Sequence, residues 1–279
     1  MDITNIVNGV NFKRISNVVL DVDNIHQPRN YRSKNIIFCK TDLIPLLFNE
    51  LRVHDSKNIL ITHESDYEIN GSIFFGKPPC IVKWYAQNVN YPDPNLIPLP
   101  IGLENHEGPS KGTMIDLEFI KNLVPDYQPT NKIFDKIYCN IRITHKDRPA
   151  VKQFLIDSGL GYIEPPTGPL ESGMIISRDH HKMLSKFLFI ASPRGNGIDC
   201  HRTWESLIMG SLPIVDRHFM FDTYPHLPII QVSNWAELLD GKILEHYKNL
   251  YLKGKLFYDM EVLTMDYWIK QIEQEFNQL

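Results

Sequence analysis

Cysteine is scarce in this sequence. Four cysteines occur among 279 residues, and no two of them form a CxxC pair. This spacing excludes a zinc ribbon and a small disulfide framework, both of which need closely paired or numerous cysteines. Cys39 and Cys139 lie within apolar runs, which predicts buried thiols rather than reactive ones.

Long apolar runs and an excess of basic charge are also missing. No window approaches the roughly 18 consecutive apolar residues of a membrane span, and residues 1–16 contain no apolar core of signal-peptide length. The formal net charge of −4 argues against general affinity for nucleic acid or an anionic membrane. We therefore expect a soluble, cytoplasmic protein that recognises any phosphate group locally.

The length indicates more than one domain. A chain of 279 residues exceeds the usual single-domain size, and suits two domains of about 120 to 150 residues each. We expect an N-terminal domain over residues 1–110 and a C-terminal domain over residues 111–261. A final helix over residues 262–279 is expected to pack back on the N-terminal domain.

The N-terminal half alternates between buried strands and a helix. Residues 35–39 and 58–62 are predicted strands, and residues 41–53 are a predicted helix with Pro45 in its first turn. Because this spacing leaves room for a crossover helix, the two strands are expected to be parallel neighbours in an α/β fold. Further strands are expected at residues 18–22, 80–85 and 96–103, the last near a sheet edge because it contains prolines.

The C-terminal half repeats this alternation. Strands are predicted at residues 132–140, 187–191, 212–215 and 227–232. Helices are predicted at residues 114–124, 149–158, 178–184 and 201–210, with another from Asn234. Residues 160–178, which include the run PPTGP, are expected to form an irregular loop.

Residues 186–215 concentrate the polar residues of the C-terminal half between two buried strands. Ligands of open α/β sheets lie beyond the carboxyl ends of the strands, and helix N–H groups there attract phosphate. His201, Arg202 and Thr203 open the predicted helix and would bind a diphosphate. Glu205 would then accept hydrogen bonds from ribose hydroxyls. The remaining candidates for nucleotide-sugar binding in this segment are Ser192, Arg194, Asn196 and Asp199.

A plainer interpretation of the same segment is possible. Arg202 and Glu205 stand three residues apart and could form an ordinary ion pair on a helix surface. Asp199 could be a simple N-cap. We favour ligand binding because a pure scaffold rarely places so many polar groups between two buried strands. Gly210 is expected to end the helix.

A second polar cluster follows the strand at residues 58–62. His63, Glu64 and Asp66 are each able to remove a proton from a hydroxyl group, although a solvated loop with a helix cap is an alternative. Trp84, near the end of the next strand, could present its ring to a sugar. It could equally be a core residue.

The run S-P-R-G-N-G-x-D-x-H-R-x-W-E-x-L-x-x-G-x-x-P-I-V, which starts at Ser192, resembles the donor-binding signature of exostosin-like glycosyltransferases. The resemblance implies the GT-B fold, in which two Rossmann-like domains face each other across a cleft. It also implies a UDP-sugar donor and transfer with inversion. No GxGxxG or Walker A sequence offers a different phosphate site.

The same resemblance assigns further residues. Relatives carry a Ser-Asp element after the N-terminal strand, which favours Asp66 as the catalytic base, with Glu64 second and His63 third. They also carry an arginine after the first C-terminal strand, which implies donor contacts from Arg142 and Arg148. A basic loop that caps the following helix is the alternative for these two arginines.

No metal is expected at the donor site. The only DxD sequence is formed by Asp21 and Asp23 near the N-terminus, away from the predicted donor site, so we interpret both as loop carboxylates. The helix N-terminus with Arg202 can supply the positive charge that a metal would otherwise provide.

The closest resemblance within the family is to virus-encoded xylosyltransferases that act on the N-glycan of a capsid protein. It implies UDP-xylose as the donor and a fucose-containing N-glycan as the acceptor. Two other functions stay open. A nucleotide-sugar epimerase or hydrolase would need no acceptor, and a non-catalytic module would only bind glycans.

Overall fold

The computed structural model describes residues 5–103, 132–164, 173–256 and 258–279; for 173–178 it describes the backbone alone. Contacts divide these residues into two units. One, here the β1–β7 unit, contains residues 5–101, 197–199 and 261–279. The other, the β8–β12 unit, contains the rest. The predicted boundary at residue 110 and the predicted helix at 114–124 lie outside the described residues.

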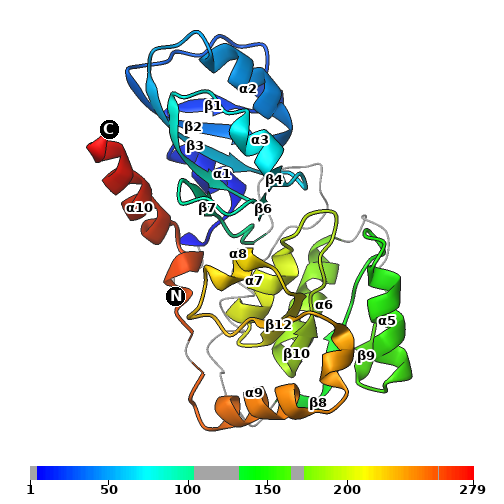
Figure 1. Cartoon of the computed structure of the whole chain (residues 1–279). Helices are drawn as coiled ribbons and strands as arrows, with labels where there is room; N and C mark the ends of the chain where they lie inside the picture. Colours follow the sequence, from blue (N-terminus) through cyan, green and yellow to red (C-terminus); the bar gives the residue numbers. More distant parts are fainter. Residues whose placement is uncertain (1–4, 104–131, 165–172, 257) are drawn as a thin grey trace. The chain divides into compact units, whose positions relative to one another are not determined.

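The β1–β7 unit is built on one parallel sheet with strand order β1-β2-β3-β5-β7 (Figure 1). The predicted strands of this half are confirmed, and the last one lies at the sheet edge as its prolines indicate. The strands are β1 Val18–Leu20, β2 Lys34–Lys40, β3 Lys57–His63, β5 Ile81–Ala86 and β7 Leu96–Pro98.

The helix after β2 shows why the local sequence folds as it does. A 3-10 turn, η3 Thr41–Leu43, leads into α2 Ile44–Leu51. Pro45 stands in the first turn of α2, where a missing N–H costs no hydrogen bond. The buried residues of α2 recur three and four positions apart, so that one face packs on the sheet; they are Ile44, Leu47, Phe48 and Leu51.

Shorter elements complete this unit. They are α1 Gly9–Arg14, η2 Val22–Asn24, β4 Ile69–Asn70 paired with β6 Val89–Asn90, and α3 Gly71–Phe75. The C-terminal helix α10 Met265–Gln278 also packs in this unit. The Trp268 ring meets the Tyr85 ring edge-on at 6.3 Å, and Lys83 Nζ lies 3.5 Å from the carboxylate of Glu275.

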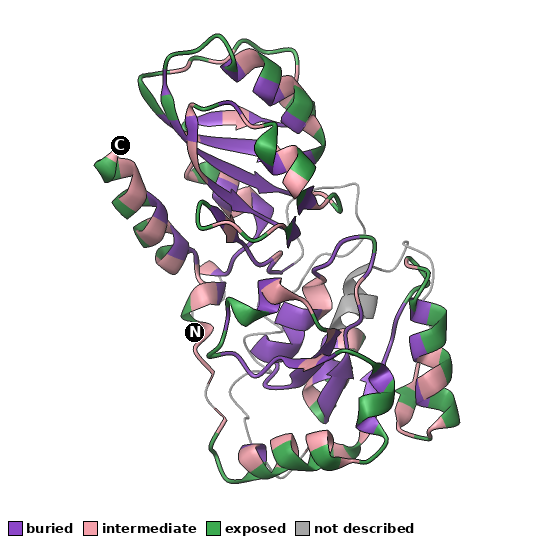
Figure 2. Cartoon of the chain, in the orientation of Figure 1, coloured by how far each residue is buried: buried purple, intermediate pink, exposed green. Residues whose placement is uncertain are grey.

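The β8–β12 unit contains a second parallel sheet, with strand order β12-β11-β10-β8-β9. Its strands are β8 Ile133–Cys139, β9 Gly161–Ile163, β10 Phe187–Ala191, β11 Leu212–Asp216 and β12 Ile230–Val232. All five residues of β10 are buried (Figure 2), as expected for a parallel strand covered on both faces. Both units are therefore mixed α/β with parallel, Rossmann-like sheets.

The helices of the β8–β12 unit are α5 Arg148–Asp157, α6 Gly173–Lys186, α7 His201–Ile208, α8 Phe219–Asp222 and α9 Lys242–Leu252. Two 3-10 turns, η6 Trp235–Leu238 and η7 Met260–Leu263, precede α9 and α10. Gly210 ends α7 as predicted, with φ of 65°, and Ser211 N donates to Ser206 O across it. Among the residues that the structure describes, no helix is long and apolar enough to cross a membrane.

The expectation of an irregular loop over residues 160–178 is wrong at both ends. Gly161–Ile163 form strand β9, and α6 begins at Gly173. The strand has only three residues, none of them fully buried, so that it shows no apolar run. Tertiary pairing with β8 decides its conformation.

The strand order of the second sheet marks a position for ligands. From β8 the chain passes outward to β9, and then returns to the other side of β8 to form β10, β11 and β12. The order thus reverses between β8 and β10. In open α/β sheets, the crevice at the carboxyl ends of two such strands is the usual ligand site. The predicted donor residues lie on the loops that follow β8 and β10 and on the helices α5 and α7 that these loops enter.

Lys132, just before β8, connects several elements at the amino-terminal ends of the strands of this sheet. Its Nζ lies within hydrogen-bond distance of four oxygens: Ser185 O at 2.8 Å, Phe187 O at 3.4 Å, Met209 O at 3.2 Å and Ser211 Oγ at 2.7 Å. Burial lowers the pKa of Lys132 to about 7, although four acceptors favour the charged ammonium. One side chain thus joins the ends of α6 and α7 to β10.

Replacement of Lys132 by methionine leaves buried carbonyl oxygens without a donor. We expect the free energy of unfolding to fall by about 2 to 3 kcal/mol, since each unsatisfied buried group costs about 1 to 3 kcal/mol. Urea denaturation of the variant measures this change. Lys242→Met removes a lysine whose side chain is 85% exposed and is the control; equal stability of the two variants would contradict the role of Lys132.

Candidate functional site

The loop between β10 and α7 is held in shape by buried side chains. Ser192 Oγ and Thr203 Oγ1 lie 2.9 Å apart, and both residues are buried. Arg194 N donates to the Asp216 carboxylate at 3.0 Å, and Trp235 Nε1 donates to the other oxygen of that carboxylate at 2.8 Å. Ser192 and Thr203, two predicted donor contacts, therefore bond to each other in this structure.

Arg148, the first residue of α5, clamps the same loop. Its guanidinium donates to the main-chain oxygens Arg194 O and Arg142 O, each at 2.8 Å, and to Pro193 O at 3.2 Å. Gly195 makes room for it, because a Cβ there would lie 2.9 Å from Arg148 Nη2. Arg148 thus shapes the loop, and its predicted contact with a nucleotide stays a prediction.

Arg202 differs from Arg148 in having unused donors. Its Nε and Nη1 are buried, and no described residue accepts a hydrogen bond from either atom. Burial lowers the pKa of Arg148, and the positive charge of Arg202 lowers it further. Buried guanidinium nitrogens without an acceptor, in a region that holds a second cation, favour an anion as the missing partner.

Glu205 faces α6 instead of Arg202. His180 Nε2 lies 3.6 Å from Glu205 Oε2, and His181 Nε2 lies 3.8 Å from Glu205 Oε1. Burial alone would raise the pKa of Glu205, but the contacts with the two histidines outweigh it and hold the pKa well below its usual range. Glu205 is therefore a buried, ionised carboxylate, and its side chain is 10% exposed.

This geometry differs from the plainer interpretation of α7. Among the described residues, the Glu205 carboxylate lies against His180 and His181, and Arg202 forms no ion pair. The N-cap of α7 is Cys200, which makes no side-chain hydrogen bond to the helix. Asp199 is not the cap. Its carboxylate accepts from Ile101 N at 2.7 Å within the β1–β7 unit.

The other predicted donor residues lie on the loops around α7, except His201, which is its first residue. Arg142 and Asn196 are exposed. His201 Nδ1 lies 2.8 Å from Gly102 O. Arg194 is partly buried in the loop that Arg148 clamps. The direct contacts that all these residues would make with a donor remain predictions.

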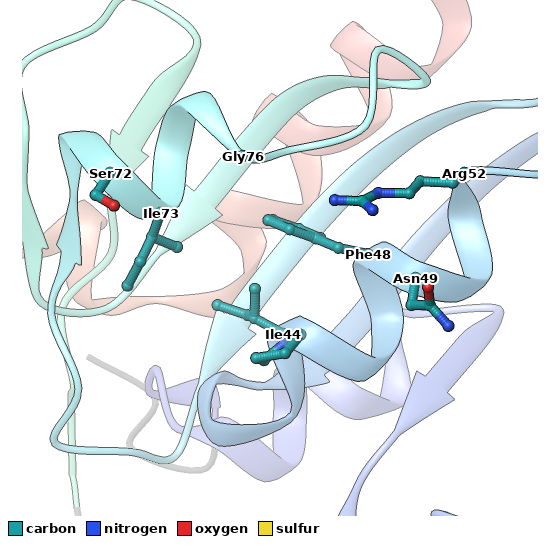
Figure 3. Close-up of a pocket in the computed structure, with 8 residues that line it drawn as sticks. Ile44, Phe48, Asn49, Arg52, Ser72, Ile73 and Gly76 are labelled. Carbon is teal, nitrogen blue, oxygen red and sulfur yellow. The ribbon is translucent and has the colours of Figure 1, made fainter.

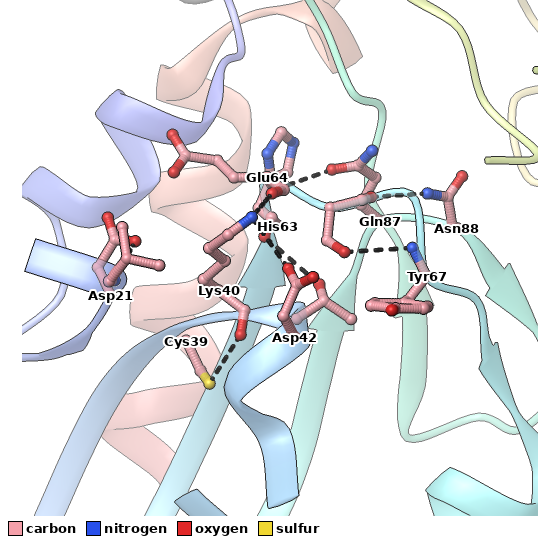
Figure 4. A network of polar contacts seen from close by, with 12 residues as sticks. Asp21, Cys39, Lys40, Asp42, His63, Glu64, Tyr67, Gln87 and Asn88 are labelled. Carbon is pink, nitrogen blue, oxygen red and sulfur yellow. Dashed lines mark hydrogen bonds and ion pairs between the residues drawn. The ribbon is translucent and has the colours of Figure 1, made fainter. Parts of the chain in front are cut away.

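In the β1–β7 unit, Glu64 lies at the centre of a polar network at the carboxyl edge of the sheet (Figure 4). Lys40 Nζ donates to Glu64 O at 2.6 Å, and Glu64 N donates to Gln87 Oε1 at 3.0 Å. The Glu64 carboxylate pairs with Lys13 at 2.5 Å. Its φ of 60° is in the left-handed region, which is rare for glutamate and is frequent at functional sites.

Lys13 joins two carboxylates at this edge. Its Nζ lies 2.5 Å from Asp21 as well as 2.5 Å from Glu64. Burial alone would lower the pKa of Lys13, but hydrogen bonds to both acids raise it. Gly9 allows α1 to approach, because a Cβ there would lie 2.3 Å from Glu64 Cγ. The contact with Lys13 thus fixes the Glu64 carboxylate in position.

The remaining candidates at this edge differ in exposure. Asp66 is exposed on the loop after β3, where an acceptor hydroxyl could reach it. His63 is 2% exposed, with Nε2 3.3 Å from Pro100 O. Trp84 is fully buried, and its Nε1 donates to Thr62 Oγ1 at 2.9 Å. In this structure Trp84 is a core residue and offers no ring face to a sugar.

The two aspartates of the DxD sequence lie in different surroundings. Asp21 caps η2 and pairs with Lys13, whereas Asp23 is exposed. Across the described ranges, no group of three or more His, Cys, Asp or Glu side chains has an arrangement that could hold a metal ion.

Several site residues were missed by the sequence analysis. His180 and His181 fall in a segment whose helix was predicted short, so their position over α7 was not evident. Lys13 lies some 50 positions before Glu64 in the sequence, so that their contact is tertiary and has no local pattern. The adjacent pair His180-His181 before a buried strand is the one pattern that could have indicated the first of these contacts.

A cavity of about 490 Å³ lies between α2 and α3 (Figure 3). Its lining combines apolar residues, among them Ile44, Phe48 and Ile73, with the polar residues Asn49, Arg52 and Ser72. None of the predicted donor or acceptor residues lines it.

Comparison with known proteins leaves the sequence and the geometry as the basis for function. The chain matches no protein-family model and no curated protein.

The histidine–glutamate cluster predicts acid sensitivity. Burial lowers the pKa of His180 below its ordinary 6.5, and the pKa of Glu205 lies well below 4.5. For both groups the unfolded chain binds more protons than the folded chain as the pH falls. The free energy of unfolding should therefore fall below about pH 6.5, first through His180 and then through Glu205.

Urea denaturation between about pH 7.5 and pH 5 measures this effect. In His180→Asn the part of the decrease nearest pH 6.5 should disappear, because asparagine does not titrate. An unchanged pH dependence in that variant would contradict the assignment.

Proposed function

We propose that this protein is an inverting glycosyltransferase that uses a UDP-sugar as its donor. The observation that carries the proposal is the partly buried Arg202, whose buried atoms Nε and Nη1 have no acceptor among the described residues. It stands in the first turn of α7, beside the point where the strand order reverses. A diphosphate supplies the acceptors that this position lacks.

The donor half of the reaction follows from α7. Arg202 and the first N–H groups of α7 bind the diphosphate and stabilise the charge that develops on departing UDP. Glu205, an ionised acceptor one turn further along, takes hydrogen bonds from ribose hydroxyls. No metal is required, because the guanidinium and the helix N-terminus provide the positive charge.

The acceptor half uses a carboxylate of the β1–β7 unit. Asp66 removes the proton from an acceptor hydroxyl, and the oxygen attacks the anomeric carbon as the bond from that carbon to the UDP oxygen breaks. The electron pair of the broken bond leaves with UDP. One base and one displacement invert the configuration without a covalent intermediate.

The finer features of the proposal come from the resemblance to exostosin-like glycosyltransferases. They are the GT-B arrangement of the two units, UDP-xylose as the donor and a fucose residue of an N-glycan as the acceptor. The site residues support nucleotide-diphosphate recognition, and they do not distinguish one sugar from another.

Calorimetric titration with a panel of UDP-sugars in the presence of EDTA tests the proposal. We expect one UDP-sugar to bind without metal, and UDP to be released only when a fucosylated glycan is added. Turnover without an acceptor would indicate an epimerase or a hydrolase instead. Failure of every UDP compound to bind would contradict the donor site and the proposed function.

Replacement of Asp66 by asparagine tests the base. UDP affinity should stay nearly unchanged, and turnover should fall roughly a hundredfold or more, the usual contribution of a general base. Asp23→Asn, which removes another exposed carboxylate of the same unit, is the matched control in the UDP-release assay. Near-normal turnover in Asp66→Asn would exclude it from this role and favour Glu64.

A further inference from the structure

Arg202 and Glu205 stand at a spacing that ordinarily produces an ion pair. Residues three apart on a helix are neighbours, and arginine and glutamate at this spacing attract each other. Such a pair would satisfy the guanidinium internally and cancel its charge. An anion site at α7 therefore needs something that keeps Glu205 away from Arg202.

The carboxylate of Glu205 instead contacts two histidines of α6. His180 faces one carboxylate oxygen at 3.6 Å, and His181 faces the other at 3.8 Å. His181 is 2% exposed, so its ring is fixed by packing. Each oxygen of Glu205 thus has its own imidazole, whereas two nitrogens of Arg202 are left without an acceptor among the described residues.

The chemistry of the histidines suits this task. Burial lowers the pKa of His180 and outweighs Glu205, which raises it, so that this ring is neutral at physiological pH. A neutral imidazole at 3.6 to 3.8 Å from a carboxylate oxygen packs against it without adding a cation. The positive charge of Arg202 therefore stays available for a ligand.

We infer that His180 and His181 are positioning residues that keep Glu205 from neutralising Arg202. This inference rests on the proposed nucleotide-sugar site and adds to it a device that maintains its charge. The histidines contact no substrate. They act through Glu205, and their effect is on the affinity of the α7 N-terminus for a diphosphate.

Pyrophosphate is a suitable probe, because it tests the diphosphate position without any contact between Glu205 and ribose. In the variant His180→Leu/His181→Leu, Glu205 loses its partners and is expected to turn to Arg202. Pyrophosphate affinity, measured by calorimetry, should fall about tenfold or more, as expected for the loss of a charge-assisted hydrogen bond. Addition of Glu205→Gln to this variant should restore the affinity to within about threefold of the original.

The rescue separates this role from a merely structural one. If loss of the histidines caused a structural defect, the lower affinity would persist after Glu205→Gln. If Glu205 only competes for Arg202, Glu205→Gln removes the competition and restores the affinity. His180→Asn/His181→Asn, which keeps an N–H donor at each position, should bind pyrophosphate nearly normally. His246→Leu, on the exposed face of α9, is the matched control for the substitution.

The outcomes distinguish this inference from the proposed function. If the unaltered protein binds neither UDP nor pyrophosphate, the nucleotide-sugar site itself is contradicted. If it binds them and the leucine variant binds pyrophosphate equally well, only the role of the histidines is overturned. Absence of rescue in the folded triple variant overturns it too. Should the double variant not fold, the single variants His180→Leu and His181→Leu are each expected to lose part of the pyrophosphate affinity. Normal affinity in both would overturn the role of the histidines.

Discussion

A partly buried arginine, Arg202, with two buried nitrogens that no described residue accepts from, is the constraint on which the β8–β12 unit depends. Taking a cation out of water costs several kcal/mol unless hydrogen bonds or an opposite charge compensate. Arg148 meets this cost with main-chain oxygens. Arg202 does not, since two of its nitrogens have no acceptor among the described residues. The fold tolerates this imbalance at the switch point of the sheet, where a ligand would correct it.

The β1–β7 unit has a corresponding constraint at the carboxyl edge of its own sheet. Glu64 adopts a left-handed conformation, and bonds from Lys40, Gln87 and Lys13 hold it there. Strain of this kind costs about 1 to 3 kcal/mol and persists where the surroundings fix it. Asp66, two residues further on, is exposed. The network thus fixes the start of the loop that carries Asp66, the proposed proton acceptor.

The sequence predicts the strands well and the site contacts poorly, for physical reasons. Buried parallel strands such as 187–191 are continuous apolar runs, and Gly210 marks a helix end that needs positive φ. β9 has no such pattern because its pairing with β8 is tertiary. The spacing of Arg202 and Glu205 indicates an ion pair, but His180 and His181 on another helix decide where the carboxylate turns. Trp84 could have been a sugar platform or a core residue, and only burial separates the two.

Calorimetry of UDP and uridine binding to Arg202→Gln tests the central claim most directly. The account predicts that UDP affinity falls by about tenfold to a hundredfold, since a charge-assisted contact with phosphate is lost. Affinity for uridine, which has no phosphate, should be unchanged. Arg52→Gln, an exposed arginine of the β1–β7 unit, should bind both ligands normally. Undiminished UDP affinity in Arg202→Gln would contradict the account.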